Sequence, residues 1–302
     1  MNDPHPQNLA AKIDRLIQED GQHPTGIEGL CLLRVSKPTP PMPVVYSPRL
    51  FVVAQGKKDV IAGSHINECN AFQYLLLTVP LPIQGKITQA SKQKPFLAMN
   101  IELDMAMVAE VLQQMNPQDT VGHNEKWHAS RGFQANPLDK ELIDALRRLL
   151  DALSNTERAR ILGTMVLREI FYLLLCRKEG EILRAFVQQD RHGFRIAQVL
   201  DYIQVNLHLP LSVETLADMA NMSQSSFHEH FKTVTNTSPQ QYIKSMRLDR
   251  ARRQLVEQGL SVSEAAYGVG YASTSQFSRE FKRLFGVSPR EAVAPLGGFA
   301  GI

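Results

Sequence analysis

Hydrophobic and polar positions alternate in short runs over the first 136 residues, which is typical of strands. Runs at 44–46, 50–53 and 72–77 are rich in β-branched and aromatic residues and are separated by Pro, Gly and Asn. Several short strands at this spacing predict a small barrel or sandwich. The first 20 residues instead have the pattern of an amphipathic helix.

The pattern changes to a helical period between residues 137 and 190. One apolar stripe consists of Leu138, Leu142, Leu146, Leu149, Leu150 and Leu153. A second helix is predicted over about 157–177, with apolar positions at Ile161, Met165, Leu167, Ile170 and Leu174. These helices could form a dimer surface, or they could be a cover packed on the barrel. The pattern breaks near Asp190 and Arg191, and all-helical periodicity follows to the end.

The helical C-terminal part contains the same small unit twice. The first copy has three pieces in order: Leu-Ser-Val at 211–213, Phe-x-x-x-Phe-Lys at 227–232 and Ser-Pro at 238–239. The second copy has the same pieces at 260–262, 277–282 and 288–289. Because these pieces recur in one order at a nearly constant offset, we interpret them as two helix-turn-helix units, 212–234 and 261–285, that read adjacent major-groove segments of DNA.

In each unit the second helix carries two phenylalanines one turn apart, so both face inward and the opposite side chains face solvent. We expect contacts to bases from the outward polar residues Ser225, Ser226, His228, Glu229, Thr274, Ser275, Gln276, Ser278 and Arg279. Arg279 can make a bidentate contact to guanine, and Gln276 can pair with adenine. Contacts to phosphates are expected from Lys232, Lys282, Ser223 and Ser273. Since the first copy offers no Arg or Lys to bases, the second should supply more of the specific binding energy.

A basic helix is predicted between the two units. Ser238 supplies a cap and Pro239 suits the first helical position, and the helix should run to about residue 258. About 20 residues rise roughly 30 Å, close to the roughly 34 Å of one DNA turn, so the two reading helices could enter successive major grooves. Its basic residues are Lys244, Arg247, Arg250, Arg252 and Arg253.

Composition adds less than the repeat does. The net charge is +3, and all of it lies from Arg191 onward, where 12 Lys and Arg face 9 Asp and Glu. Cys31, Cys69 and Cys176 are widely spaced and odd in number, which favours a reducing cytoplasm over a disulfide framework. No apolar run approaches the roughly 20 residues of a membrane span. We therefore expect a cytoplasmic protein that does not enter a membrane.

The C-terminal part resembles the AraC/XylS family of transcription regulators. The resemblance rests on three stretches: Phe-x-x-x-Phe-Lys with Ser-Pro-x-x-Tyr at 227–242, Arg-Leu-x-x-Ala-Arg-x-x-Leu at 247–255, and Gly-x-Gly-Tyr followed by Gln-Phe-Ser-Arg-x-Phe-Lys at 268–282. It implies binding to promoter DNA and contact with RNA polymerase. The N-terminal half is similar to a branch with a cupin-like sensor, through Val-Ala-Gln-Gly-Lys-Lys at 53–58 and Leu-Pro at 81–82. Some members of that branch are linked to aldehyde stress, which makes an aldehyde one candidate effector.

A sensor of this kind would hold its effector in an apolar pocket inside the barrel. Candidate lining residues are Tyr46, Phe51, Val53, His65 and Tyr74, with His65 in a turn. Cys69 could instead sense electrophiles or oxidants. A cupin-type metalloenzyme needs His-x-His and a Glu on strands, which is not found, and His228 and His230 point apart on their helix, so we expect no metal, no cofactor and no enzymatic activity. His123 and His128, beside Trp127, are expected on the surface.

These inferences define an α+β protein of several domains. A cupin-like sensor with an N-terminal helix (1–136) precedes a helical dimerisation segment (137–190) and an all-α DNA-binding domain with two helix-turn-helix units (191–302). The predicted function is sequence-specific transcription regulation, as a homodimer that binds double-stranded DNA and a small-molecule effector. Two alternatives remain open: a cupin-type metalloenzyme fused to a DNA-binding domain, and a DNA-binding dimer that needs no ligand.

Overall fold

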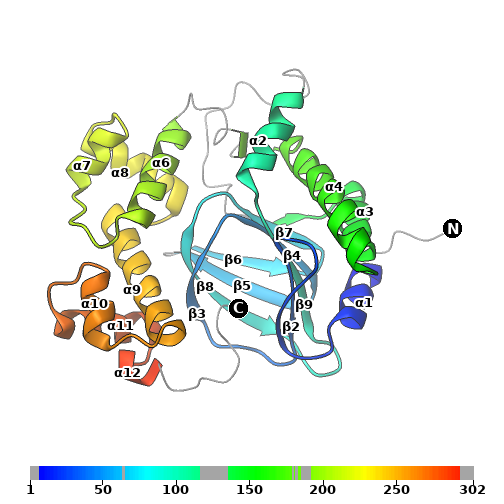
Figure 1. The fold of residues 1–302 in the computed structure, drawn as a ribbon, viewed down its shortest axis with the longest axis horizontal. Coiled ribbons are helices and arrows are strands. Elements are labelled where there is room, and N and C mark those ends of the chain that lie inside the picture. Colours follow the sequence, from blue (N-terminus) through cyan, green and yellow to red (C-terminus); the bar gives the residue numbers. More distant parts are fainter. Residues whose placement is uncertain are drawn as a thin grey trace.

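The computed structural model of the chain describes residues 7–62, 65–115, 135–178, 180, 183–184 and 192–292. The predicted junction near residue 190 and the segment with His123, Trp127 and His128 lie outside these ranges. In Figure 1 two sheets occupy the middle of the molecule, with one group of helices on each side of them.

The sensor half contains two antiparallel sheets. The larger has the spatial order β1 (Gly21–Pro24), β2 (Leu30–Val35), β9 (Phe96–Glu102), β4 (Arg49–Gln55), β7 (Gln73–Leu77) and β10 (Ala135–Pro137). The smaller has the order β3 (Met42–Tyr46), β8 (Leu81–Gln89), β5 (Lys57–Ala62) and β6 (His65–Asn70). One buried cluster joins Phe51 and Val53 of the larger sheet with Val60 and Ile87 of the smaller. The predicted small β-barrel or sandwich is therefore confirmed.

Helices cover the outer face of the larger sheet. They are α1 (Gln7–Leu16), α2 (Met105–Gln114), α3 (Lys140–Ala152) and α4 (Thr156–Leu175). Four residues of the predicted leucine stripe, Leu142, Leu146, Leu149 and Leu150, are buried in α3 against this face, together with Leu167, Ile170 and Leu174 of α4. The other two, Leu138 and Leu153, lie just outside α3 and are partly buried. Ile161 and Met165 do not join that stripe, because their side chains are 48% and 64% exposed on the opposite side of α4.

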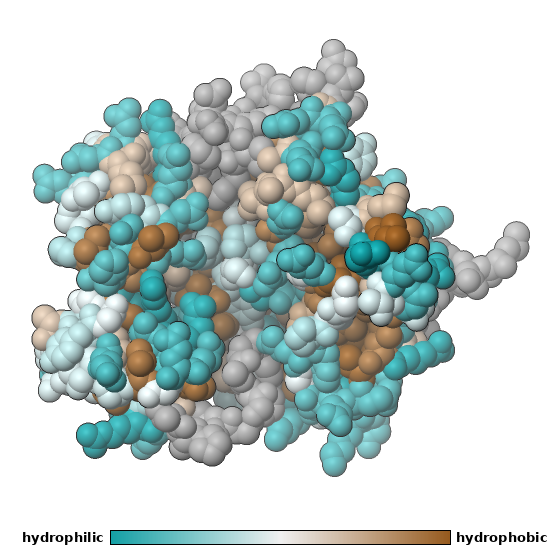
Figure 2. Space-filling model, viewed as in Figure 1, coloured by the Kyte–Doolittle hydropathy of each residue, from teal (hydrophilic) through white to brown (hydrophobic). Residues whose placement is uncertain are grey.

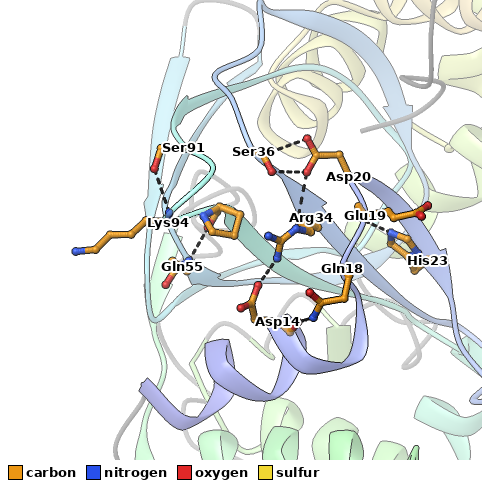
Figure 3. A network of polar contacts seen from close by, with 11 residues as sticks. Asp14, Gln18, Glu19, Asp20, His23, Arg34, Ser36, Gln55, Ser91 and Lys94 are labelled. Atoms are coloured by element: carbon orange, nitrogen blue, oxygen red, sulfur yellow. Dashed lines mark hydrogen bonds and ion pairs between the residues drawn. The ribbon is translucent and has the colours of Figure 1, made fainter.

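Polar contacts hold α1 to the sheet. In Figure 3 the guanidinium of Arg34, on β2, points to Asp14 of α1 and to Asp20 beyond its end. Asp20 also accepts hydrogen bonds from the backbone and the hydroxyl of Ser36, at 3.0 and 2.6 Å. Ile13 is fully buried on the other side of α1, so this helix is an integral part of the sensor half.

The C-terminal part is entirely helical over the described residues. Its helices are α6 (His192–Val205), α7 (Val213–Met219), α8 (Gln224–Thr235), α9 (Pro239–Glu257), α10 (Val262–Gly268), α11 (Thr274–Phe285) and α12 (Pro289–Ala292). In Figure 1, α9 runs from the α6–α8 group to the α10–α12 group. The predicted pair of helical units joined by one long helix is therefore confirmed.

Candidate nucleic-acid interface

The first unit, α7 and α8, is shaped by capping and by an aromatic pair. The hydroxyl of Ser212 accepts a hydrogen bond from the backbone of Thr215, and that of Ser223 accepts one from Ser226, so each helix has a defined start. Phe227 and Phe231 are fully buried with their rings 5.4 Å apart. This burial fixes which face of α8 is turned outward.

The outward face of α8 carries most of the residues of the first unit that are predicted to contact DNA. Ser225, His228, Glu229 and Lys232 are exposed, and Ser226 is partly buried. Lys232 is its only cation, beside the acidic Glu229. The chemistry of this face therefore favours weak or shape-dependent contacts over strong base recognition.

The second unit, α10 and α11, follows the same plan. Ser261 and Glu264 form a complete capping box at the start of α10. Gly270 has φ +86°, and a Cβ there would lie 2.9 Å from the carbonyl oxygen of Leu207, so the turn requires glycine. Phe277 and Phe281 are fully buried with their rings 5.5 Å apart. The repeat in the sequence therefore corresponds to a repeat in structure.

The outward face of α11 is richer in donors. Ser275, Gln276, Arg279 and Lys282 are exposed, whereas Thr274 and Ser278 are partly buried. Ser273 caps the helix by accepting a hydrogen bond from the backbone of Gln276 at 3.3 Å. Arg283, which the sequence analysis did not select, is also exposed on this helix. The outward face of α11 thus has three exposed cations within about one turn, whereas that of α8 has one.

Gln276 is restrained by a polar network before any DNA is present. Its side-chain amide donates to Glu280 at 3.4 Å, and Lys244 of α9 lies 3.1 Å from the same carboxylate. The hydroxyl of Tyr271 donates to the other carboxylate oxygen at 2.8 Å. Burial raises the pKa of Glu280, but the hydrogen bonds from Tyr271, Lys244 and Gln276 outweigh it, and the pKa lies below its ordinary value. The charged carboxylate of Glu280 thus holds the side-chain amide of Gln276 against the surface of α11.

The cations of α9 act mainly as braces. Arg247 donates to the carbonyls of Leu207 and Leu209 at 2.8 and 2.7 Å, and Arg250 donates to that of Gln204 at 3.2 Å. These carbonyls follow or end α6, so the two arginines tie α9 to the first unit. These arginines of α9 therefore make contacts inside the protein. The sequence alone could not distinguish such arginines from ones that contact DNA phosphates.

The DNA-facing half is joined to the sensor through a shared core. The hydroxyl of Tyr242, on α9, donates a buried hydrogen bond to the carbonyl of Pro80 at 2.9 Å. The ring of Tyr242 meets Phe231 of α8 edge to face at 5.4 Å. The same apolar cluster includes the inner faces of both sheets and the first unit, whereas Phe277 and Phe281 belong to a separate cluster. The apolar cluster therefore runs from the sheets through α9 to the first unit, whereas α11 of the second unit contacts β3 directly.

The predicted effector residues do not all face the space between the two sheets. Tyr46, Phe51 and Val53 are buried in the cluster between the sheets. The placement of Tyr74 inside the barrel was wrong, because this ring is buried on the helix-covered face. His65 begins β6, paired with Ala62, and does not lie in the turn; its side chain is outside the described residues.

The interior also contains a buried lysine that the sequence analysis did not select. Lys58 is 1% exposed, and its ammonium donates to the hydroxyl of Tyr46 at 2.8 Å and lies 4.5 Å from the centre of the Phe51 ring. Its cross-strand neighbour is Cys69, which is fully buried. Burial raises the pKa of the Cys69 thiol to about 12, which disfavours a reactive thiolate.

The described residues were also compared with the requirements of a metal site and of a membrane span. Among the residues that the structure describes, no group of three or more His, Cys, Asp or Glu side chains is placed to hold a metal ion. None of the helices over the same residues is long and apolar enough to cross a membrane.

The fold and the two capped reading helices define a regulator with a sheet-based N-terminal domain and a double helix-turn-helix. Residues 26–182 match the family model of the AraC-type transcriptional regulator N-terminus, and residues 216–294 match a helix-turn-helix domain. The chain belongs to the family of AraC-type transcriptional regulators.

Similar proteins include transcriptional activators. The chain is 28% identical over 183 residues to the activator RhaS of Escherichia fergusonii, covering 60% of this chain and 62% of that protein. It is 29% identical over 151 residues to RhaS of Yersinia pestis, covering 50% and 55%. The matches thus span about half to three fifths of the relatives' length.

Solved structures of ToxT from Vibrio cholerae share the fold over most of the chain. One superposes with a TM-score of 0.58 at 14% identity, covering 89% of this chain and 98% of that one. ToxT bound to an unsaturated fatty acid gives a TM-score of 0.57, also at 14% identity, covering 91% and 96%. At this identity the likeness concerns the fold alone.

Proposed function

We propose that the protein is a DNA-binding transcription regulator that reads two neighbouring segments of one DNA site with α8 and α11. The observation that carries this proposal is the pair of reading helices, each fixed by a buried Phe-x-x-x-Phe pair and joined by α9. The exposed polar residues predicted from the sequence, from Ser223 to Lys232 and from Ser273 to Lys282, supply the contacts. The RhaS relatives are activators, which supports activation through contact with RNA polymerase in the bacterial cytoplasm.

A selection experiment tests this proposal. Sheared genomic DNA is incubated with the purified protein at about 150 mM salt, and the retained fragments are sequenced. Enrichment of a few fragments with a shared sequence is expected. Uniform retention that disappears as salt rises would mean that the protein contacts phosphates without reading bases, and would contradict the proposal.

The helix α4 supports the further proposal of a homodimer. Ile161, Met165 and Tyr172 are 48%, 64% and 43% exposed along its outer side. Figure 2 shows brown side chains among teal ones on the right, where α1, α3 and α4 lie. The inner side of α4 is buried, so the helix both covers the sheet and offers an apolar surface to a second copy. The two roles expected for this segment, a dimer surface and a cover on the sheet, are therefore compatible, because opposite sides of α4 would serve them.

The N-terminal domain is proposed to bind a small-molecule effector. ToxT, which shares this fold, has been solved with an unsaturated fatty acid and with (E)-4-(8-methylnaphthalen-1-yl)but-3-enoic acid, so a protein with this fold can hold an organic ligand. Because the core runs from the sheets into the first unit, a ligand that favours one arrangement would change how α8 is presented to DNA.

A further inference from the structure

The carboxylate of Glu280 on α11 is held in place independently of Gln276. Its side chain is 15% exposed, and the hydroxyl of Tyr271 donates to one of its oxygens at 2.8 Å. The ammonium of Lys244, on α9, lies 3.1 Å from the other oxygen. Burial, together with the hydrogen bond to Glu280, raises the pKa of Tyr271, so this hydroxyl stays protonated and remains a donor. The carboxylate therefore has a defined position on the surface of α11.

Tyr271 is itself fixed by the core of the second unit. It is 8% exposed, and its ring meets that of Phe277 edge to face at 5.3 Å. Its backbone N–H donates to the carbonyl of Ala266 at 3.0 Å, and Phe277 is fully buried. The polar network thus begins in the core of the unit and ends at the exposed side chain of Gln276.

The first unit does not repeat this network. The residues that correspond to Tyr271, Gln276 and Glu280, 50 positions earlier in the chain, are Asn221, Ser226 and His230. None of these carries a carboxylate, so the network is not part of the plan that the two units share. It is a property of the second reading helix.

The carboxylate determines which end of the Gln276 amide faces it. An ionised carboxylate only accepts hydrogen bonds, whereas a side-chain amide has an accepting oxygen and a donating NH2 group. Burial alone would raise the pKa of Glu280, but its hydrogen bonds lower it below the ordinary value, so the group is ionised at neutral pH. The Nε2 of Gln276 accordingly faces Glu280 at 3.4 Å. One N–H is used in this contact, and the oxygen and the other N–H remain for a ligand.

This use of one N–H changes which base the amide can pair with. In the major groove adenine offers one acceptor and one donor, at N7 and N6, whereas guanine offers two acceptors, at N7 and O6. An unrestrained glutamine can turn its NH2 group toward guanine and donate both N–H groups to it. With one N–H bound to Glu280, the amide oxygen of Gln276 would instead lie against the O6 of guanine, and two acceptors repel. The tethered amide therefore fits adenine and disfavours guanine.

We propose that Glu280 is a positioning residue for base recognition, which holds Gln276 in the orientation that accepts adenine and rejects guanine at one base pair of the DNA site. This inference rests on the proposed function, because it assigns a base preference to one contact of α11. Lys244 offsets the charge of the carboxylate, which would otherwise repel the DNA phosphates.

Fluorescence anisotropy with the full-length protein tests this inference. The probes are duplexes of the sequence enriched by the genomic selection, with each base pair replaced in turn by the alternatives. At one position the wild type should prefer adenine over guanine by about fivefold to a hundredfold, and Gln276→Ala should lose this preference. Glu280→Ala and, as a second disruption that keeps a long side chain, Glu280→Met should lower the ratio at the same position to about threefold or less.

Further variants separate positioning from a general effect on the fold. Combining Glu280→Ala with Gln276→Ala should lower the adenine preference no further than Gln276→Ala alone, because both changes remove the same contact. Glu257→Ala removes an exposed carboxylate at the end of α9 and should keep every base preference of the wild type.

The outcomes distinguish this inference from the proposed function. An adenine-to-guanine ratio that is unchanged in Glu280→Ala and Glu280→Met, with or without an equal loss of affinity for all duplexes, would overturn the inference. Retention of the preference by Gln276→Ala would overturn it as well. In both cases specific binding by the wild type would leave the proposed DNA-reading function standing. A wild type that prefers no sequence would refute that function, and this inference with it.

Discussion

The hydroxyl of Tyr242 donates a hydrogen bond to the carbonyl of Pro80, 2.9 Å away and 162 residues earlier in the chain. Pro80 lies between β7 and β8 of the sensor, and Tyr242 lies on the helix that joins the two reading units. The Tyr242 ring also contacts Phe231, which holds the first reading helix. This single side chain therefore links the sensor, α9 and α8.

Replacing Tyr242 with Phe should destabilise the protein by about 1–3 kcal/mol, because the buried carbonyl of Pro80 loses its donor. Urea unfolding followed by circular dichroism measures the effect. Tyr267→Phe is the matched control, since Tyr267 is 58% exposed and its change should stay within about 0.5 kcal/mol. An unfolding midpoint of Tyr242→Phe equal to that of the wild type would show that the bond contributes no stability.

Gly85 should not tolerate alanine while Lys58 is present. A Cβ at Gly85 would lie 2.8 Å from the Cε of Lys58, whose side chain is enclosed between the sheets. Such overpacking costs about 1–3 kcal/mol. Gly26→Ala is the control, because its Cβ would meet only Ala159 at an ordinary 3.6 Å.

A double-mutant cycle tests whether the clash with Lys58 causes the loss of stability in Gly85→Ala. Combining Gly85→Ala with Lys58→Ala should give a coupling of at least about 0.5 kcal/mol, because truncating the Lys58 side chain removes the Cε that makes the close contact. Strict additivity would mean that the cost arises elsewhere in β8.

Substitutions of Arg279 and of Lys282 should weaken DNA binding in different ways. Arg279→Ala should cost about 1–3 kcal/mol on the selected site and relax the preference at one base pair. Lys282→Ala should weaken all sequences about equally and lower the salt dependence by about one unit. Fluorescence anisotropy on cognate and scrambled duplexes, with Arg158→Ala as control, distinguishes the two. Identical behaviour of both variants would refute the division into base and phosphate contacts.

The carboxylate of Glu280 should make stability depend on pH. Its hydrogen bonds to Tyr271, Lys244 and Gln276 outweigh burial and lower its pKa below the ordinary 4.5. A lowered folded pKa stabilises the protein above pH 4.5, and that contribution is lost as the pH falls through the folded pKa. The Tm difference between wild type and Glu280→Gln should therefore be largest near pH 7 and shrink on acidification. A difference that is constant down to pH 3 would contradict this role.

Substitution of Met165 should change the oligomeric state. Met165→Arg places a charge at the centre of the exposed stripe of α4, so a dimer held by that stripe should dissociate at micromolar concentration. Sedimentation velocity compares it with the wild type and with Thr164→Arg, which adds the same charge at an exposed position about 100° around the same helix. A wild-type protein that is already monomeric would rule out the dimer.

The double helix-turn-helix could be predicted because its determinants are local. Caps such as Ser261 with Glu264, the Phe pairs one turn apart and Ser-Pro at the start of α9 all act within a few residues. The exposed face of each reading helix follows directly from those pairs. The roles of the individual side chains on DNA remain predictions.

The sensor was harder to predict for a physical reason. Residues 50 to 54 of β4 are all buried, because one face of the sheet packs on the other sheet and the opposite face packs on helices. Alternation therefore cannot tell the inside from the outside, and Tyr74 was assigned to the wrong face. The helix α2 was missed, although Asp104 caps it. Contacts between residues that are far apart in the sequence, such as Tyr242 and Pro80, produce no local sequence pattern and so could not be predicted.

Footprinting on one selected DNA fragment tests the account most directly. Hydroxyl-radical cleavage in the presence of the protein should show two protected patches on one face of the duplex, about one helical turn apart. Arg279→Ala should weaken the patch of α11 and leave the other. A single patch, or two patches on opposite faces of the duplex, would contradict a protein that reads adjacent major grooves with both units.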